Sequence, residues 1–283
     1  MKIILLGTGG PKPDPNRQGP CLVIQTNNQN ILFDAGRGAG TQLVRAGLAI
    51  DRINPIFITH HHYDHIGNLG DLILSSWNLG RKEQLSIFGP EGTLEIVDVL
   101  LNHVYKRDID FRLAEAAISG VTLKNIDSIV KAEDISPGLV YENNGVKIYA
   151  DYVKHGHGLR ISQDSWKCLG YRIEAEGKII TISGDTVGCK GLAALAKDSD
   201  VLVLCCYLSA KELEDAEGDL IAKHILTCSP QAGTIARKAN VKKLILTHFR
   251  EKSNQAIKEV VLEIGADFNG EVIPGCDLSV INI

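Results

Sequence analysis

Short apolar runs alternate with amphipathic segments along the whole chain, and Gly, Pro, Asn or Asp commonly bound the runs. Runs of this kind predict β-strands. In the first half, strands are predicted at residues 2–6, 21–25, 30–34, 55–59 and 85–88. Helices are predicted at residues 40–46, 69–79 and 93–105, where apolar side chains recur with helical spacing. The first half therefore predicts an α/β arrangement.

A second series of the same kind follows in the other half of the chain. Its strands are predicted at residues 146–153, 169–174, 178–183, 201–204, 243–247 and 271–273, and its helices at 192–197, 230–239 and 255–263. Between the two series, residues 110–145 show weak periodicity, which predicts a linker or an insertion. We expect two similar halves within one domain, residues 1–283, because the candidate chemistry described below draws on both.

The composition predicts a folded globular protein without a general affinity for nucleic acid. Of the 283 residues, 44% are hydrophobic and 23% are charged, which is far from the composition of disordered chains. The 30 Lys and Arg against 34 Asp and Glu give a net charge of -4 at pH 7. This balance disfavours a dedicated nucleic-acid-binding protein, although a local basic patch stays compatible with it.

Cysteine usage and the apolar runs indicate a cytoplasmic protein. The 7 cysteines include no pair with the spacing of a zinc ribbon, and their odd number does not fit a disulfide framework. The apolar run at the amino terminus is too short for a secretory signal and ends in glycines. No uncharged apolar stretch is long enough to span a membrane. We therefore expect a reducing compartment, the cytosol, and no membrane.

The segment after the predicted strand 55–59 concentrates residue types that bind metals. It contains His60, His61, His62, Asp64 and His65 within six consecutive positions. Imidazole nitrogens and carboxylate oxygens are the ligands that zinc and related metals prefer. The alternative is a solvated histidine-rich loop. Further candidate ligands elsewhere in the chain favour the metal site.

Three of those further candidates each stand at the end of a predicted strand. They are His155, Asp185 and His248. Singly, each has a structural explanation, because a histidine at a strand end often forms only a hydrogen bond, and an aspartate after a glycine is a common turn residue. Loops at strand ends of an α/β sheet also collect catalytic groups. Together with the histidine-rich segment, the three complete a set for two metal ions.

The order of these residues resembles that of the metallo-β-lactamase superfamily. The resemblance rests on Thr59, His60, His62, Asp64, His65, His155, Ser183, Gly184, Asp185, Leu246, Thr247 and His248. Residues 6–17, 33–38, 89–92, 169–172 and 275–278 are similar to the arylsulfatase and ribonuclease Z branch. The resemblance covers the chain from about its first residue to its end. It implies an αββα sandwich with a binuclear metal site at the sheet edges.

The resemblance also implies a role for each candidate ligand. The first metal would be held by His60, His62 and His155, the second by Asp64, His65 and His248, and Asp185 would bridge both. Asp64 is in addition a candidate catalytic residue that orients the attacking hydroxide. His157 is an alternative to His155. His61 is expected to point away from its neighbours in an extended loop.

A second candidate catalytic residue is His224. It resembles a histidine of this branch that donates a proton to the leaving group. Two extra residues separate His224 from the helix that contains Ala232 and Gly233, so a surface histidine near a helix is the competing interpretation.

Two further positions are interpreted as structural. Cys205 and Cys206 stand where the branch often carries a His-Glu pair, and we interpret them as small apolar residues at the end of a core strand rather than thiolate ligands. Asp34 is interpreted as a buried hydrogen-bonding residue behind the histidine-rich segment rather than a ligand. Neither interpretation adds a metal ligand to the set.

These inferences predict a binuclear metal-dependent hydrolase that cleaves a sulfate, phosphodiester or carboxyl ester with metal-bound hydroxide. A metal pair about 3.5–4 Å apart activates a shared water and stabilises the attacking and leaving oxygens. Zinc is the default metal, and iron or manganese suits the same ligands. The predicted partner is a small or medium ester, with nucleic acid disfavoured and no membrane. A homodimer through residues 69–105 is compatible with the sequence.

Two alternative functions remain open. One is a ribonuclease Z type endonuclease that processes the 3′ end of tRNA. The acidic net charge argues against it, and so does the short interval between His155 and Asp185, which leaves no room for a long arm that grips tRNA. The other is a non-catalytic metal-binding sensor. The complete ligand set argues against the sensor, because a structural zinc site needs only four ligands.

Overall fold

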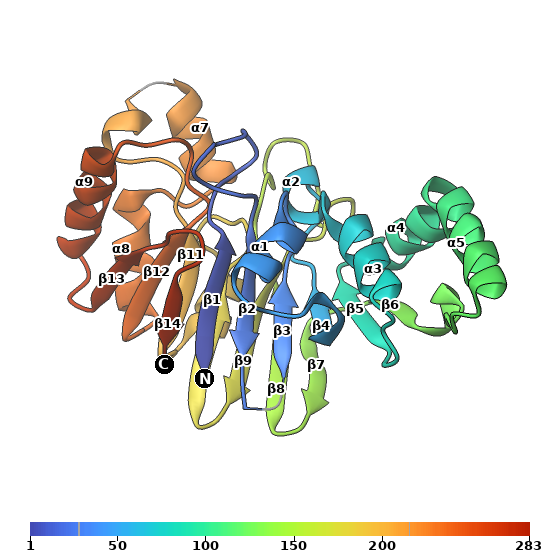
Figure 1. Cartoon of the computed structure of the whole chain (residues 1–283). Coiled ribbons are helices and arrows are strands. Elements are labelled where there is room, and N and C mark those ends of the chain that lie inside the picture. The colour runs from blue at the N-terminus through green and yellow to red at the C-terminus, as the bar shows by residue number, and fades with distance from the viewer. Residues whose placement is uncertain (28, 215) are drawn as a thin grey trace.

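The computed structural model describes residues 1–27, 29–214 and 216–283. Two mixed β-sheets stack face to face, and helices cover the outer face of each sheet (Figure 1). This arrangement confirms the expected αββα sandwich. Each half of the chain builds most of one sheet, as the two predicted series indicate.

Within the described residues, the first sheet has seven strands in the order β14-β1-β2-β3-β4-β5-β6. They are β1 (Lys2–Gly7), β2 (Cys21–Gln25), β3 (Asn30–Phe33), β4 (Ile53–Phe57), β5 (Leu85–Gly89), β6 (Val130–Asp134) and β14 (Val280–Asn282). Strands β3 to β6 are parallel, and Leu32 lies opposite Ile56, which in turn lies opposite Ile87. The remaining pairs are antiparallel.

The second sheet likewise has seven strands among the described residues, in the order β13-β12-β11-β10-β9-β8-β7. They are β7 (Gly138–Asn143), β8 (Val146–Tyr152), β9 (Leu169–Ala175), β10 (Lys178–Ile182), β11 (Val201–Cys205), β12 (Lys243–Thr247) and β13 (Glu271–Pro274). Strands β10 to β13 are parallel. Strand β8 also runs in their direction, because β9 is antiparallel to both β8 and β10.

The helices lie on the outside of the sandwich and at one of its ends. The α-helices are α1 (Ala39–Arg45), α2 (Tyr63–Ile66), α3 (Leu69–Asn78), α4 (Thr93–Val99), α5 (Lys106–Ser119), α6 (Lys190–Ala196), α7 (Ala216–His224), α8 (Ser229–Lys238) and α9 (Asn254–Gly265). Short 3₁₀ turns occur at η1 (Ile50–Arg52), η3 (Ile126–Ser128) and η4 (Lys211–Leu213), and η2 (Leu100–Val104) is a π-helix. Helices α2 and α7 lie toward the same end of the sandwich (Figure 1).

Alternation along the strands divides their side chains between separate cores. In β1, Ile3 and Leu5 pack between the two sheets, whereas Ile4 packs against the helices of the first layer. In β11, Val203 likewise faces the other sheet and Leu204 faces the outer helices. Because both faces of each sheet are covered, these strands are apolar throughout, which is why they stand out in the sequence.

The region 110–145 differs from the predicted linker or insertion. It contains most of α5 and all of η3, β6 and β7. In α5, the buried residues are Ile109 and Ala116, and other apolar side chains such as Phe111 are exposed, so the apolar positions do not gather on one face to give a periodic pattern. Strands β6 and β7 lie at the ends of their sheets, where much of each strand faces solvent. Within the described part of the chain, no helix has both the length and the apolar character needed to cross a bilayer.

Candidate metal centre

The candidate ligands converge at one end of the sandwich because the strands before them run toward it. His60 and His62 follow β4, and α2 begins at the next residue, so Asp64 and His65 lie on its single turn. The other three candidates follow strands β8, β10 and β12, which run in one direction within the second sheet. Segments far apart in the sequence thus meet at one point.

The first group of candidate ligands is His60, His62 and His155. Their ligand atoms and one carboxylate oxygen of Asp185 all lie within 4.8 Å of one another. Nε2 of His60 is 2.9 Å from Nδ1 of His62, and Nε2 of His155 is 3.1 Å from the same atom. His60 and His155 are buried, whereas His62 is exposed. The first group is therefore open to solvent on the side of His62.

The second group is Asp64, His65 and His248, and all three residues are buried. Their ligand atoms also lie within 4.8 Å of one another. Nε2 of His248 is 3.4 Å from Oδ2 of Asp64, and Nε2 of His65 is 3.9 Å from the same oxygen. The second group is thus enclosed by the protein.

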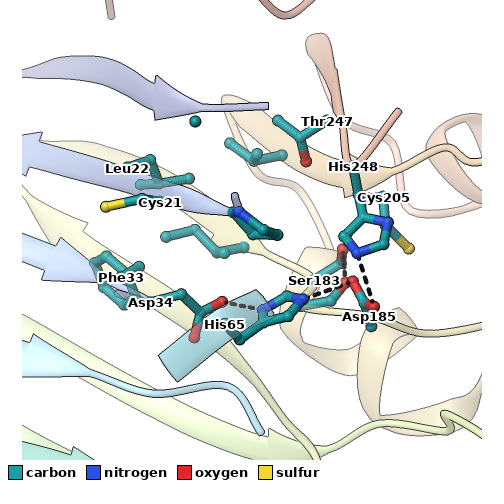
Figure 2. A pocket seen from close by; sticks show the side chains of 15 residues that line it. Cys21, Leu22, Phe33, Asp34, His65, Ser183, Asp185, Cys205, Thr247 and His248 are labelled. Carbon is teal, nitrogen blue, oxygen red and sulfur yellow. Dashed lines mark hydrogen bonds and ion pairs between the residues drawn. The ribbon is translucent and has the colours of Figure 1, made fainter. Parts of the chain in front are cut away.

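Asp185 lies between the two groups. Its Oδ2 is 3.9 Å from Nε2 of His60 and 3.8 Å from Nε2 of His155. On the other side, Oδ2 is 3.1 Å from Nε2 of His248 and Oδ1 is 3.5 Å from Nε2 of His65. Dashed lines in Figure 2 mark both ion pairs. One carboxylate therefore faces both sets of imidazoles.

Buried polar atoms without hydrogen bonds in the second group indicate that the site fits metal ions. Among the described residues, four buried atoms lack a hydrogen-bonding partner: Oδ2 of Asp64, Nε2 of His65, and Nδ1 and Nε2 of His248. A buried polar atom without a partner is costly, and proteins rarely leave one unpaired. Three of these atoms, Oδ2 of Asp64, Nε2 of His65 and Nε2 of His248, are the candidate ligand atoms of the second group. Their position and their N/O chemistry fit a divalent metal ion.

The electrostatics of the first group and of Asp185 favour the protonation states that bind metals, whereas in the second group burial is outweighed by the neighbouring carboxylates, Asp185 above all, which raise the pKa of His65 and His248. Burial, together with the charge of His65, lowers the pKa of His60 well below its usual value. Burial and the neighbouring His155 lower the pKa of His62 to about 4. Burial opposes ionisation of Asp185, but His248 and His65 outweigh it and hold its pKa well below the usual range. At neutral pH the first group therefore presents neutral imidazoles beside a carboxylate.

Asp34 and Thr59 support the second group from behind. Oδ2 of Asp34 accepts a hydrogen bond from Nδ1 of His65 at 2.8 Å, and Oδ1 accepts one from the backbone N–H of Thr59 at 2.8 Å. A carboxylate on the far nitrogen fixes the tautomer and orientation of a ligating imidazole. Asp34 and His248 both have positive backbone φ, 58° and 60°, at the ends of their strands. The structure thus confirms Asp34 as a buried hydrogen-bonding residue.

A sequence pattern for the whole superfamily decides the family of the chain. The pattern described as "Beta-lactamase superfamily domain" matches residues 29–249. The chain belongs to the beta-lactamase superfamily. Two solved structures of the same fold superpose over nearly the entire chain. The metallo-beta-lactamase fold protein YhfI from Bacillus subtilis has a TM-score of 0.74 at 19% identity and covers 99% of this chain and 97% of its own. Human tRNase Z, short form, has a TM-score of 0.71 at 24% identity, with coverage of 100% and 99%.

Relatives within the superfamily correct the predicted partner. A protein named Ribonuclease Z from Mycolicibacterium paratuberculosis is 30% identical over 294 residues, which cover 100% of this chain and 98% of that protein. The chain is a metal-dependent hydrolase of ester bonds, as predicted. The expectation of a small or medium ester with nucleic acid disfavoured is wrong, because this full-length relative is named as a ribonuclease. Net charge describes the whole surface and misses the local field at a site.

Of the alternatives left open at the ligand positions, the first group of candidate ligands contains His155 and does not contain His157 or His61. Nδ1 of His157 accepts a hydrogen bond from the backbone N–H of His155 at 3.0 Å, and its Nε2 lies 2.8 Å from the carbonyl oxygen of Trp166. Both ring nitrogens of His157 are thereby engaged away from the cluster. Nε2 of His61 lies 2.8 Å from Oγ1 of Thr93. His61 thus points away from its neighbours, as expected.

His224 lies beside the site but outside both ligand groups. It ends α7, and its carbonyl oxygen accepts a hydrogen bond from the backbone N–H of Gly156 at 2.7 Å. Its ring packs so closely against Gly158 that a Cβ there would lie 2.8 Å from Nδ1. The imidazole therefore contacts the loop that directly follows His155. This contact depends on tertiary structure, and no local sequence pattern indicates it.

The two cysteines at the end of β11 are buried, as interpreted. Sγ of Cys205 accepts a hydrogen bond from the backbone N–H of Thr186 at 3.4 Å, which fastens the residue next to Asp185. Burial and the charge of Asp185 raise the pKa of Cys205 to about 12, so its thiol stays protonated and is a poor metal ligand. Cys206 belongs to the core beneath the outer helices.

Proposed function

We propose that this chain is a ribonuclease Z type endonuclease that hydrolyses one phosphodiester bond at the 3′ end of tRNA precursors. The observation that carries the proposal is the match to Ribonuclease Z at 30% identity over 100% of this chain and 98% of the relative. The tRNase Z fold, with a TM-score of 0.71 over the full chain, is consistent with it. The gathered candidate ligands supply the chemistry that such a reaction needs.

In this proposal, two zinc ions bind to the two ligand groups. His60, His62 and His155 would hold the first ion, Asp64, His65 and His248 would hold the second, and Asp185 would serve both. The four unpartnered buried atoms and the position of Asp185 support this assignment. When bound, such a pair polarises a phosphoryl oxygen and activates water. Neutral imidazoles and carboxylates suit zinc, and iron or manganese fits the same donors.

The protein's own groups then orient the reactants and move a proton. Asp64 points an oxygen without a hydrogen-bonding partner among the described residues into the second group, where it orients the attacking water. His224, packed on the loop after His155, donates a proton to the leaving oxygen. General acid catalysis contributes about 10²- to 10⁴-fold. We therefore expect His224→Asn to lower kcat by that factor at unchanged metal content, whereas the exposed His103→Asn serves as a matched control.

We also propose that the enzyme works in the cytoplasm. All 7 cysteines of the chain are free, and Cys276 is exposed. Free thiols suit a reducing compartment. Location of a tagged protein in fractionated cells tests this directly, and recovery outside the cytoplasm contradicts it.

The decisive experiment is cleavage of a tRNA precursor that carries a 3′ trailer. Zinc- or manganese-loaded protein is expected to release the trailer at a single position, and a chelator is expected to abolish cleavage. The same RNA without a folded acceptor stem and a panel of small sulfate and carboxyl esters are the controls. Efficient chelator-sensitive turnover of a small ester without any cleavage of the precursor contradicts the proposal.

A further inference from the structure

The entrance to the metal centre lies at His62, and an indole ring lies against it. Of the candidate ligands, His62 is the exposed one. The ring of Trp166 is centred 4.8 Å from the ring of His62, with an angle of 41° between the planes. It lies 6.0 Å from the ring of His60. Trp166 is itself partly exposed, so a molecule that reaches the first group passes beside this indole.

The loop between β8 and β9 fixes Trp166 in this position. The carbonyl oxygen of Trp166 accepts a hydrogen bond from Nε2 of His157, and its backbone N–H donates to the carbonyl oxygen of Ser162 at 3.1 Å. The next residue, Lys167, forms an ion pair with Glu91 of the first half. His157, which is not among the candidate ligands, therefore acts as a support for this indole. The backbone of Trp166 is thus fixed, and its side chain packs partly against the outer core of the second half.

The same loop lies between His155 and Asp185, an interval that is too short for a long arm that grips tRNA. Between His155 and Asp185 the chain forms only the loop of residues 156–168 and the hairpin of β9 and β10, all of which the structure describes. A phosphodiester bound at the ligand groups would bring an attached nucleoside toward the exposed His62 and the indole beside it. Aromatic side chains next to a backbone-binding groove bind bases by stacking, irrespective of sequence.

We propose that Trp166 is the platform on which the nucleobase next to the scissile phosphodiester stacks. This inference rests on the proposed function, since it assigns the part of an RNA substrate that the site recognises. The indole binds an unpaired base through its π-face, and His157 positions the indole. Binding of the one base beside the scissile bond then replaces part of the binding that a longer tRNA-gripping arm would provide. Trp166 is then a substrate-binding residue that distinguishes a nucleotide with a base from one without.

Intrinsic fluorescence tests binding to this platform. The chain has 2 tryptophans, and the other one, Trp77, is 1% exposed and donates its indole N–H to the carbonyl oxygen of Lys124 at 2.7 Å. The probe is a hairpin RNA that mimics the acceptor stem and ends in one unpaired 3′ nucleotide. We expect it to quench the emission, and an otherwise identical RNA with an abasic 3′ nucleotide to bind about 5- to 150-fold more weakly. Trp166→Phe, which leaves Trp77 alone, is expected to show no quenching.

Kinetics with a precursor RNA separate stacking from a structural role. For wild-type protein, an abasic nucleotide beside the scissile bond is expected to raise KM about 5- to 150-fold. Trp166→Phe keeps an aromatic face and is expected to retain most of this ratio. Trp166→Leu keeps apolar volume without a π-face, and its ratio is expected to fall to about 1. Phe111→Leu, at a residue that is 69% exposed on α5, is the matched control.

The outcomes distinguish this inference from the proposed function. A precursor that is cleaved with the same base dependence by wild-type protein and Trp166→Leu overturns the platform and keeps the ribonuclease. Base-dependent quenching without cleavage of any precursor supports the platform and removes the ribonuclease. Wild-type emission that is equally insensitive to both hairpins overturns the platform whatever the cleavage assay gives. Bound metal is measured in each variant, and a Leu variant that loses metal is replaced by Trp166→Met.

Discussion

The two ligand groups of the metal centre contain the same types of ligand atom but lie in different surroundings. The first group has an exposed member, His62, and its ring nitrogens lie within hydrogen-bonding distance of one another. The second group is buried, and the unpartnered polar atoms of the described chain belong to it. A charged residue, Asp34, supports His65, whereas a backbone carbonyl, that of Ile225, supports His155 at 2.7 Å.

This difference indicates that the two groups have different roles in stability and in substrate access. Imidazoles that satisfy one another tolerate the absence of an ion, and exposure lets a substrate approach them. Buried atoms without partners depend on an ion for their hydrogen-bonding capacity, since each one otherwise destabilises the fold by about 1–3 kcal/mol. We therefore expect the second group to contribute more to stability and the first group to contribute more to substrate access.

The largest effect is expected at Asp185, the residue that the two groups share. Replacement by Ala removes the carboxylate that faces both, so kcat/KM for the precursor RNA should fall by about 10³-fold or more. Metal analysis should show less than one ion per chain. Asp110→Ala, at an exposed aspartate on α5 that pairs with Lys106, is the control. Full metal content in Asp185→Ala contradicts a shared ligand.

Asp34 offers a change that affects one group only. In Asp34→Asn the acceptor for the N–H of Thr59 can persist, but the charge that orients His65 is lost. Loss of such a support lowers metal affinity or activity about 10- to 100-fold. Titration with zinc is expected to show one tight and one weakened site. Equal weakening of both sites would show that the groups are not separate.

The decrease in Tm on removal of the metals compares the contributions of the two groups to stability. A ligand at about 100 times its Kd stabilises a fold by about 2.7 kcal/mol, which corresponds to a change in Tm of about 5–10 °C for a chain of this size. We expect a chelator to produce such a decrease in the wild type and most of it in His62→Ala. In His248→Ala the decrease should be below about 3 °C. Scanning calorimetry measures all three, and equal decreases in both variants contradict different roles for the two groups.

The smallest effect is expected at His61, which stands inside the ligand-rich segment and outside both groups. Its replacement by Asn removes one hydrogen bond to Thr93, which contributes about 0.5–1.5 kcal/mol. Metal content and kcat are expected to stay within about twofold of the wild type. Loss of an ion from His61→Asn, measured by metal analysis, would bring His61 into the site.

The sandwich and the candidate ligands could be predicted because both leave local signals. Strands covered on two faces are mostly apolar, as in β11, and each candidate ligand follows one of the predicted strands. His60, His62, Asp64 and His65 also stand close together in the sequence, so one motif contains more than half of the set. Strand direction then brings His155, Asp185 and His248 to the same end.

Other features of the molecule could not be predicted from the sequence. Trp166 reaches His62 only through the path of a loop, and the hydrogen bond from His157 that holds this loop depends on tertiary structure. Helix α5 has an exposed Phe111 and two buried residues, so its sequence lacks a helical period. The nucleic-acid substrate of the proposed function could not be inferred from a net charge of -4, since net charge averages over the whole surface and binding depends on the local field.

The left-handed backbone at Asp34 and His248 constrains how this site can evolve. At φ values of 58° and 60°, β-branched and bulky side chains are strained, whereas Asn, Asp and His are tolerated several times more often than other residues that have a side chain. Those few residue types are also the ones that bind or orient metal ions. Apart from Gly, the backbone thus restricts the accessible mutations at both positions to chemically useful ones. In a saturation library, survivors at these positions should be Gly and a narrow polar set even when selection acts on folding alone.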